Sequence, residues 1–143
     1  MRLVVICVAI FFVAAIVSLN ACHNTSESSV AAEEIPDVIS YNFNIRPILS
    51  DKCFKCHGPD ANKRQADLRL DIQESAYAAL KDNPDKHALV PGDPGASELY
   101  RRITTTDSSE MMPEVKSNLK PLTSYEVKLI KKWIKQGAKY EKH

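Results

Sequence analysis

The side chains of this chain best suited to chemistry lie in the segment Cys53-Phe54-Lys55-Cys56-His57. Two cysteines three positions apart, with a histidine directly after the second, form the C-x-x-C-H pattern that attaches a c-type haem. The two thiols can form thioethers with the two vinyl groups on one edge of a porphyrin, and the next imidazole can then bind the iron. The sequence therefore predicts one covalent haem c, bound by Cys53 and Cys56, with His57 as the proximal iron ligand.

Two other kinds of site use the same cysteine spacing. Structural zinc needs four protein ligands, usually two such pairs. Because Cys7 and Cys22 lie in the N-terminal segment, the remaining ligands would have to be histidines, and His57, His87 and His143 lack zinc-finger spacing. A thioredoxin-like redox pair stands beside a βαβ pattern, and none flanks this motif. Haem attachment is the favoured interpretation, with the zinc and thiol sites as alternatives.

The second axial ligand would decide the chemistry of such a haem. A thioether is a soft, neutral ligand that favours ferrous iron and raises the reduction potential. Only two methionines follow the N-terminal segment, Met111 and Met112, and they stand before Pro113 after a Thr/Ser/Asp-rich loop rather than in an apolar run. We expect Met112 to be the distal ligand, because the proline stiffens the backbone there, and Met111 to contact the haem edge. Core packing of both methionines and ligation by His87 are the alternatives.

The first 21 residues are typical of an export signal. A basic start, Met1-Arg2, precedes an apolar run from Leu3 to Val17. Leu19-Asn20-Ala21-Cys22 resembles a bacterial lipobox, in which the cysteine carries the lipid. We expect a lipoprotein-type signal peptide over 1–21 and a lipid anchor at Cys22 on the periplasmic face of a bacterial membrane. An uncleaved anchor or simple cleavage is the alternative. Export agrees with haem attachment, which takes place outside the cytoplasm.

The rest of the chain is expected to form one small domain on a tether. Residues 22–40 are polar and lack apolar periodicity, so they predict a flexible tether. The folded domain is expected over 41–140, followed by a tail over 141–143. A domain of this size has a marginal core, which a covalent haem would complete.

The charge of the chain excludes one class of partner and suggests another. Removing residues 1–21 removes Arg2 and no acid, so Lys+Arg falls from 19 to 18 against 18 Asp+Glu. A chain with this charge balance is not expected to bind nucleic acid, because nucleic-acid-binding domains are clearly basic. Lysines nevertheless outnumber acids near the C-terminus. The acids from residue 116 onward are Glu126 and Glu141, and the lysines are Lys116, Lys120, Lys128, Lys131, Lys132, Lys135, Lys139 and Lys142. Such a run is usually a solvated helix face, and it could also dock an acidic redox partner.

The first and last helices are the clearest of the elements that must position these residues. The first is expected over 43–53, with Ile45, Ile48 and Leu49 as its apolar stripe, and Gly58-Pro59 stops it just after the haem motif. The last begins after Thr123, with Glu126 completing a capping box, and ends at Gly137.

Between these two helices the sequence predicts short helices and turns. Asp71 and Glu74 predict a capped helix to about residue 80, and Pro94 opens another through Ile103. Residues 82–85 and 91–95 are typical of turns. No run is long enough for a sheet, so the predicted architecture is a small, mostly α-helical domain with long loops around one covalent haem.

Several blocks of the sequence carry a resemblance to a known family. They are Phe43 to Leu49, Cys53 to Pro59, Ala66 to Asp71, Val90 to Pro94, Ser97 to Ile103, Met112-Pro113, Leu122-Thr123 and Ile130 to Ala138. In this order the blocks resemble the planctomycete-type cytochrome c domain. The resemblance implies a class I cytochrome c fold, with His57 and Met112 as axial ligands and with the regions of Phe43 and Trp133 brought together by crossing helices. The chain departs from the family at Glu114, where the pattern often reads Met-Pro-Pro.

Electron transfer is the function that these observations favour. An iron with two protein ligands has no open site for a substrate, so the protein would pass single electrons between periplasmic or membrane-bound partners. A docking partner would use the lysine-rich C-terminal helix or the haem edge, and Arg101 and Arg102 could pair with haem propionates. A peroxidase-like catalyst, or a gas sensor in which Met112 is displaced, is the alternative.

Overall fold

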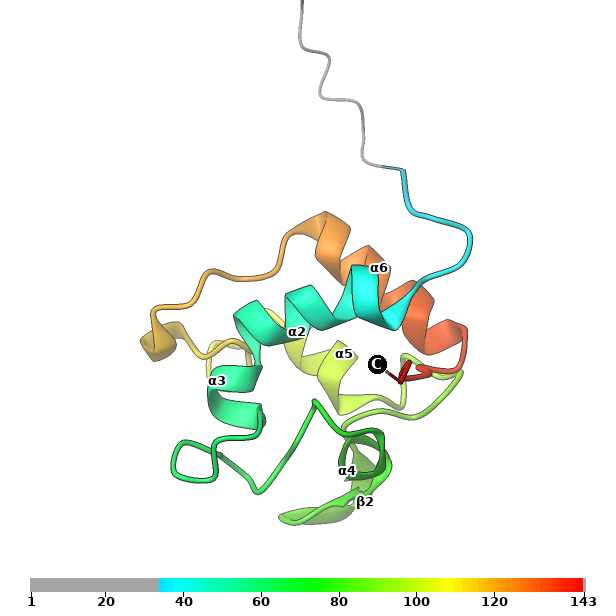
Figure 1. The fold of residues 1–143 in the computed structure, drawn as a ribbon. Coiled ribbons are helices and arrows are strands. Elements are labelled where there is room, and N and C mark those ends of the chain that lie inside the picture. Colours follow the sequence, from blue (N-terminus) through cyan, green and yellow to red (C-terminus); the bar gives the residue numbers. More distant parts are fainter. Residues whose placement is uncertain (1–33, 143) are drawn as a thin grey trace, which may run out of the picture. The chain divides into compact units, whose positions relative to one another are not determined.

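The computed structural model describes residues 34–142. The predicted signal peptide, Cys22 and most of the predicted tether lie outside these residues. Within this range, helices and a small two-stranded sheet surround one core (Figure 1). No helix of this range combines the length and the apolar character that crossing a membrane requires. The elements in order are η1 (Tyr41–Ile45), α2 (Arg46–Lys52), α3 (Phe54–His57), α4 (Gln73–Tyr77), β1 (Ala79–Leu80), β2 (Asn83–His87), α5 (Glu98–Thr104), η2 (Val115–Ser117) and α6 (Ser124–Lys135).

The first helical segment leads directly to the haem motif, as predicted. It begins with the π-helix η1, continues through α2 and ends with the single turn α3, which contains Cys56 and His57. The amide groups at a helix start have no partner within the helix. Here the Glu141 carboxylate accepts hydrogen bonds from the amides of Tyr41 (3.0 Å) and Asn42 (3.3 Å). The segment predicted as a tail therefore begins with a residue that caps the first helix.

Aromatic side chains join the two ends of the described chain. Tyr41 of η1 lies with its ring centroid 5.8 Å from that of Trp133 and 4.4 Å from that of Tyr140. The resemblance implied that the regions of Phe43 and Trp133 meet. The helices η1 and α6 do contact each other, but the contact is made by Tyr41, because Phe43 is 84% exposed.

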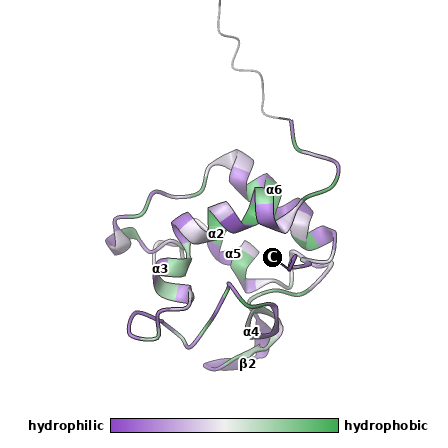
Figure 2. Cartoon of the chain, viewed as in Figure 1, coloured by the Kyte–Doolittle hydropathy of each residue, from purple (hydrophilic) through white to green (hydrophobic). Residues whose placement is uncertain are grey.

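The last helix, α6, has the start and the amphipathic pattern that its sequence predicts. The hydroxyl of Thr123 accepts a hydrogen bond from the amide of Glu126 (3.2 Å), and the Glu126 carboxylate accepts one from the amide of Thr123 (2.6 Å), which confirms the capping box. Hydrophobic and hydrophilic positions alternate around the ribbon (Figure 2). The buried face comprises Leu129, Ile130, Trp133 and Ile134.

The small sheet corrects the expectation that the chain forms none. Helix α4 ends at Tyr77, and β1 and β2 pair antiparallel with Ala79 opposite His87. Residues 83–85, predicted as a turn, lie in β2. Proline is tolerated at Pro84 because β2 is an edge strand of a two-stranded sheet. The short sheet is easily missed from the sequence because β2 lacks apolar alternation.

Two predicted helix starts are also corrected. Asp71 does not cap α4, because its carboxylate accepts a hydrogen bond from Arg69 Nε (3.1 Å) instead, and Ile72 takes the N-cap position. Helix α5 begins at Glu98 rather than near Pro94. The buried hydroxyl of Ser97 donates to the carbonyl of Asp93 (2.7 Å) and accepts from the amide of Val90 (2.9 Å), which keeps the preceding residues in a closed turn.

Candidate functional site

Residues of α3, α5, the β1–β2 hairpin and the segment 110–119 line a cavity of about 940 Å³. Its lining includes Cys53, Cys56, His57 and Met112, so the structure brings the four predicted haem-binding residues together at one site. Protein interiors normally have few voids larger than a water molecule, and a cavity of this volume is in the range of ligand and cofactor sites. Apolar side chains form much of its wall, among them Leu68, Leu70, Leu80, Leu99, Ile103 and Leu119.

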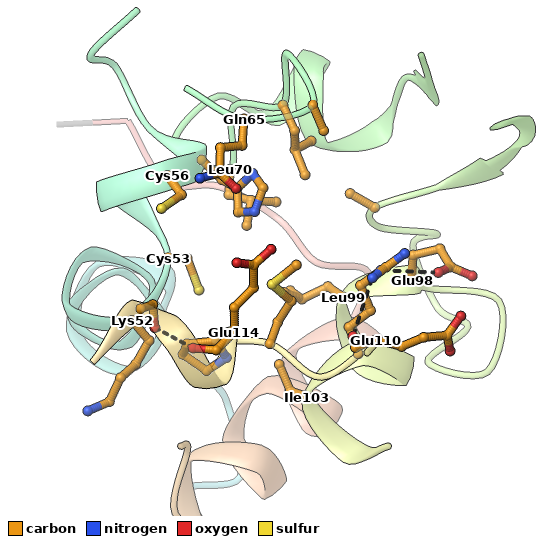
Figure 3. A pocket seen from close by; sticks show the side chains of 18 of the residues that line it. Lys52, Cys53, Cys56, Gln65, Leu70, Glu98, Leu99, Ile103, Glu110 and Glu114 are labelled. Atoms are coloured by element: carbon orange, nitrogen blue, oxygen red, sulfur yellow. Dashed lines mark hydrogen bonds and ion pairs between the residues drawn. The ribbon is translucent and has the colours of Figure 1, made fainter. Parts of the chain in front are cut away.

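The turn from α2 into α3 presents both thiols to this cavity. The carbonyl of Cys53 accepts hydrogen bonds from the amides of Cys56 (3.0 Å) and His57 (2.8 Å), which closes the turn between the two cysteines. Figure 3 shows the side chains of Cys53 and Cys56 on the same side of the cavity. Burial raises the pKa of the Cys53 thiol to about 12, so this thiol is neutral at physiological pH.

The imidazole of His57 is partly buried, and its environment favours the neutral form, which is the form that binds metals. Burial lowers the pKa of His57, so the neutral ring is favoured. Its Nδ1 is buried and makes no hydrogen bond of normal geometry. The backbone of Gln65, acting as a hydrogen-bond acceptor for the ring, raises the pKa of His57 and so opposes the effect of burial. A neutral imidazole in the cavity wall, with a backbone group behind it, fits an axial iron ligand.

The structure distinguishes among the three candidates for the distal ligand. Met112 lines the cavity and Met111 does not, so the expected contact of Met111 with the haem edge is not supported. The amide of Met112 donates to the carbonyl of Arg102 (2.9 Å), which ties this residue to α5. His87 is not among the lining residues either, and its Nδ1 lies 2.8 Å from the carbonyl of Tyr77.

Charged side chains on the cavity wall already pair with Arg101. Arg101 and Arg102 both line the cavity, as pairing with propionates would require. The Arg101 guanidinium, however, already donates to Glu98 (Nε to Oε2, 2.9 Å) and to Glu110. Hydrogen bonds from Arg101 make the largest contribution to lowering the pKa of the Glu98 carboxyl to about 2. Burial raises this pKa, and a hydrogen bond from Lys86 lowers it further. Glu98 was not predicted from the sequence as a residue of the site. Its spacing from Arg101 and Arg102 on one helix could have indicated these ion pairs.

Glu114 marks the departure from the Met-Pro-Pro pattern, and it also lines the cavity. Figure 3 shows its side chain pointing into the cavity near Cys53. Its carboxylate forms an ion pair with Lys116 at 3.2 Å. The substitution therefore places an acidic group in the wall beside the predicted haem site.

The comparison with known families gives a match over the core of this site. The family model described as Planctomycete cytochrome C matches residues 53–114. Over these residues the chain is similar to that family. The matched part begins at Cys53 and includes Met112, so it contains the four predicted haem-binding residues. The family implies haem c as the cofactor, and a cavity whose wall holds two thiols, a neutral imidazole and several leucines fits that group.

No curated protein and no solved structure gives a significant match to the chain. The zinc alternative requires a cluster of ligands, and the part of the chain from 34 to 142 contains no group of three or more His, Cys, Asp or Glu side chains that could hold a metal ion.

Proposed function

We propose that this protein is an exported mono-haem c-type cytochrome that carries single electrons between redox partner proteins. The observation that carries the proposal is the placement of His57 and Met112, which are far apart in the sequence, in the wall of one cavity with Cys53 and Cys56. The bound haem supplies one-electron exchange between ferric and ferrous iron. A class I cytochrome c fold is part of this proposal.

Each of the four residues has a defined task in this function. Cys53 and Cys56 bind the porphyrin covalently, so the cofactor stays with the protein through repeated electron transfers. His57 and Met112 would hold the iron as its two protein ligands, and an iron held in this way would have no open position for a substrate. The apolar side chains of the wall and the thioether of Met112 would favour the ferrous state.

The decisive experiment is the purification of the protein from the membrane fraction of cells that export it. We expect a coloured protein whose mass exceeds that of the chain from Cys22 by one haem and a lipid, and whose ferrous form has a low-spin spectrum. A Cys22→Ser variant should appear in the soluble periplasmic fraction with its haem. A colourless protein with the mass of the bare polypeptide would refute the proposal, and rapid peroxide turnover would favour the peroxidase alternative.

The partner is proposed to be an acidic protein that docks at the edge of the cavity. Five lysines line the cavity, and among the lysines of the C-terminal run only Lys116 does so. The side chains of Lys81 and Lys116 are 71% and 84% exposed. Cations around the site can steer an acidic partner toward it. The five are Lys52, Lys55, Lys81, Lys86 and Lys116.

A charge-reversal experiment distinguishes this edge from the lysine-rich helix α6. We expect Lys116→Glu and Lys81→Glu to slow electron exchange with an acidic redox protein at low ionic strength, and the difference to shrink as salt is added. Lys128→Glu on α6 is the matched control, because Lys128 is exposed and does not line the cavity. A larger effect of Lys128→Glu than of the other two would move the docking surface to α6.

A further inference from the structure

The start of α5 contains an unusual charged residue. Among residues 34–142, Glu98 is the one charged residue that is buried, with 8% of its surface exposed. A buried carboxylate is costly unless cations and hydrogen bonds surround it. Arg101 donates to it from Nε (3.0 and 2.9 Å) and Nη2 (2.6 Å), and Lys86 Nζ of β2 lies 2.9 Å from Oε1.

The cations around Glu98 also hold the segment that carries Met112. Arg101 Nη1 donates to the Glu110 carboxylate, and Arg102 Nη1 donates to the Glu110 carbonyl (3.3 Å). The carbonyl of Arg102 accepts the amide of Met112 (2.9 Å). Glu98 and Glu110 lie across the cavity from Cys53 (Figure 3). A continuous series of ion pairs thus runs from a buried anchor to a residue two positions before Met112.

The segment between α5 and Met112 has little else to hold it in place. Residues 106–109 are exposed. The Asp107 carboxylate accepts hydrogen bonds from the amide (2.8 Å) and hydroxyl (2.7 Å) of Ser109, and these local bonds shape the turn without attaching it to the rest of the domain. The side chains of Arg101 and Arg102 attach this segment to α5, together with the backbone bond from the amide of Met112 to the carbonyl of Arg102.

We infer that the Glu98–Arg101–Glu110 ion-pair series positions Met112 in the cavity. This inference rests on the proposed function, in which Met112 is an axial ligand. The three charged residues are positioning residues: they act through the loop and not on the haem itself. When a link of the series is removed, conformations in which Met112 has left the iron become more populated. An external ligand should then compete with Met112 more successfully.

The test uses the full-length ferric protein with its haem. Glu110→Gln removes the charge at the loop end, where the side chain is 43% exposed, so this variant should fold even if Glu98→Gln does not. Arg101→Gln removes the central link, and Arg101→Lys keeps the charge without the bidentate geometry. Arg69→Gln is the matched control, because it removes a comparable pair with Asp71 that does not line the cavity.

Three measurements are made on each variant: the affinity for imidazole, the Met–iron charge-transfer absorption, and hydrogen exchange of the peptide spanning residues 105–113. We expect Arg101→Gln and Glu110→Gln to bind imidazole about tenfold more tightly, as the loss of one charge-assisted hydrogen bond implies. Exchange of the 105–113 peptide should become faster. Arg101→Lys should restore part of the effect, and Arg69→Gln should behave as the unaltered protein.

The outcomes separate this inference from the proposed function. If Met112→Ala binds imidazole much more tightly while Arg101→Gln and Glu110→Gln change neither the affinity nor the exchange, the positioning role is overturned and the ligand assignment stands. An equal gain in Arg69→Gln would likewise overturn it, because the effect would then be one of general stability. If Met112→Ala leaves the spectrum and the affinity unchanged, both the ligand assignment and the inference are wrong.

Discussion

The carbonyl oxygen of His57 accepts a hydrogen bond from the amide of Leu70, and these two atoms are 2.9 Å apart. A second bond, from the amide of Gln65 to the carbonyl of Cys56 (2.7 Å), closes the same loop one residue earlier. Leu70 is a buried residue of the cavity wall, and its own carbonyl accepts a hydrogen bond from Tyr140 Oη (2.9 Å). The predicted proximal ligand is therefore tied through the backbone to the wall of the cavity and to the C-terminal segment.

Gly58 allows this loop to begin directly after His57. A Cβ at this position would lie 2.3 Å from the carbonyl oxygen of Phe54 and 2.9 Å from its Cβ, so the end of α3 would have to move. We expect Gly58→Ala to lower the free energy of unfolding by about 1–3 kcal/mol, the usual cost of overpacking. Urea titration of the haem-containing protein measures this change.

Gly95→Ala is the control for that substitution. Its nearest neighbour is the flexible side chain of Asp93, at 3.2 Å, and its backbone needs no left-handed conformation. Equal destabilisation by the two substitutions would contradict the steric explanation for Gly58.

The distal ligand can be tested by comparing the two adjacent methionines. We expect Met112→Ala to abolish the weak Met–iron absorption at the red end of the ferric spectrum, because Met112 lines the cavity. Met111→Ala should retain this absorption, since Met111 does not line the cavity. Loss of the absorption in Met111→Ala alone would reverse the assignment.

The stability of the domain in acid should depend on Glu98. Its pKa is held at about 2 in the folded state, below its ordinary value of 4.5. The ionised carboxylate therefore stabilises the folded state fully above pH 4.5, and this contribution is lost as the pH falls through 2. We expect it to amount to at most about 3 kcal/mol, since one pKa unit corresponds to about 1.4 kcal/mol.

Urea unfolding measured across this pH range tests the prediction. Glu98→Gln should be less stable than the unaltered protein at neutral pH, and the difference between the two should narrow as the pH falls from 4.5 toward 2. A difference that stays constant over this range would show that the ionisation of Glu98 does not contribute to stability.

The contact between the two ends of the described chain predicts a large effect on stability for one aromatic residue and a small effect for another. Trp133 is buried and its Nε1 donates to the carbonyl of Lys139 (3.0 Å). We expect Trp133→Ala to lower the free energy of unfolding by about 3–5 kcal/mol. Phe43→Ala should change it by less than about 0.5 kcal/mol, because Phe43 is exposed. Thermal unfolding of both variants checks this, and comparable losses would indicate that Phe43 is covered in solution.

Local patterns in the sequence determined the elements that depend on neighbouring residues. Haem attachment requires two thiols and an imidazole at fixed spacing, so Cys53, Cys56 and His57 could be predicted without any knowledge of the fold. The capping box of Thr123 and Glu126 could be predicted for the same reason, because its two partners are three residues apart on one helix. The family match to residues 53–114 agrees with the resemblance drawn from these motifs.

The tertiary structure decided which distant segments meet. Met112, Met111 and His87 were all candidates by type, and only the path of the loop from α5 placed Met112 in the cavity wall. The role of Glu98 depends on Lys86 of the hairpin and on Arg101, whose other partner is Glu110 of the loop. Asp71 likewise paired with Arg69 instead of capping α4. A charged side chain has several acceptable partners, and the packing of the whole chain determines which of them comes within hydrogen-bonding distance.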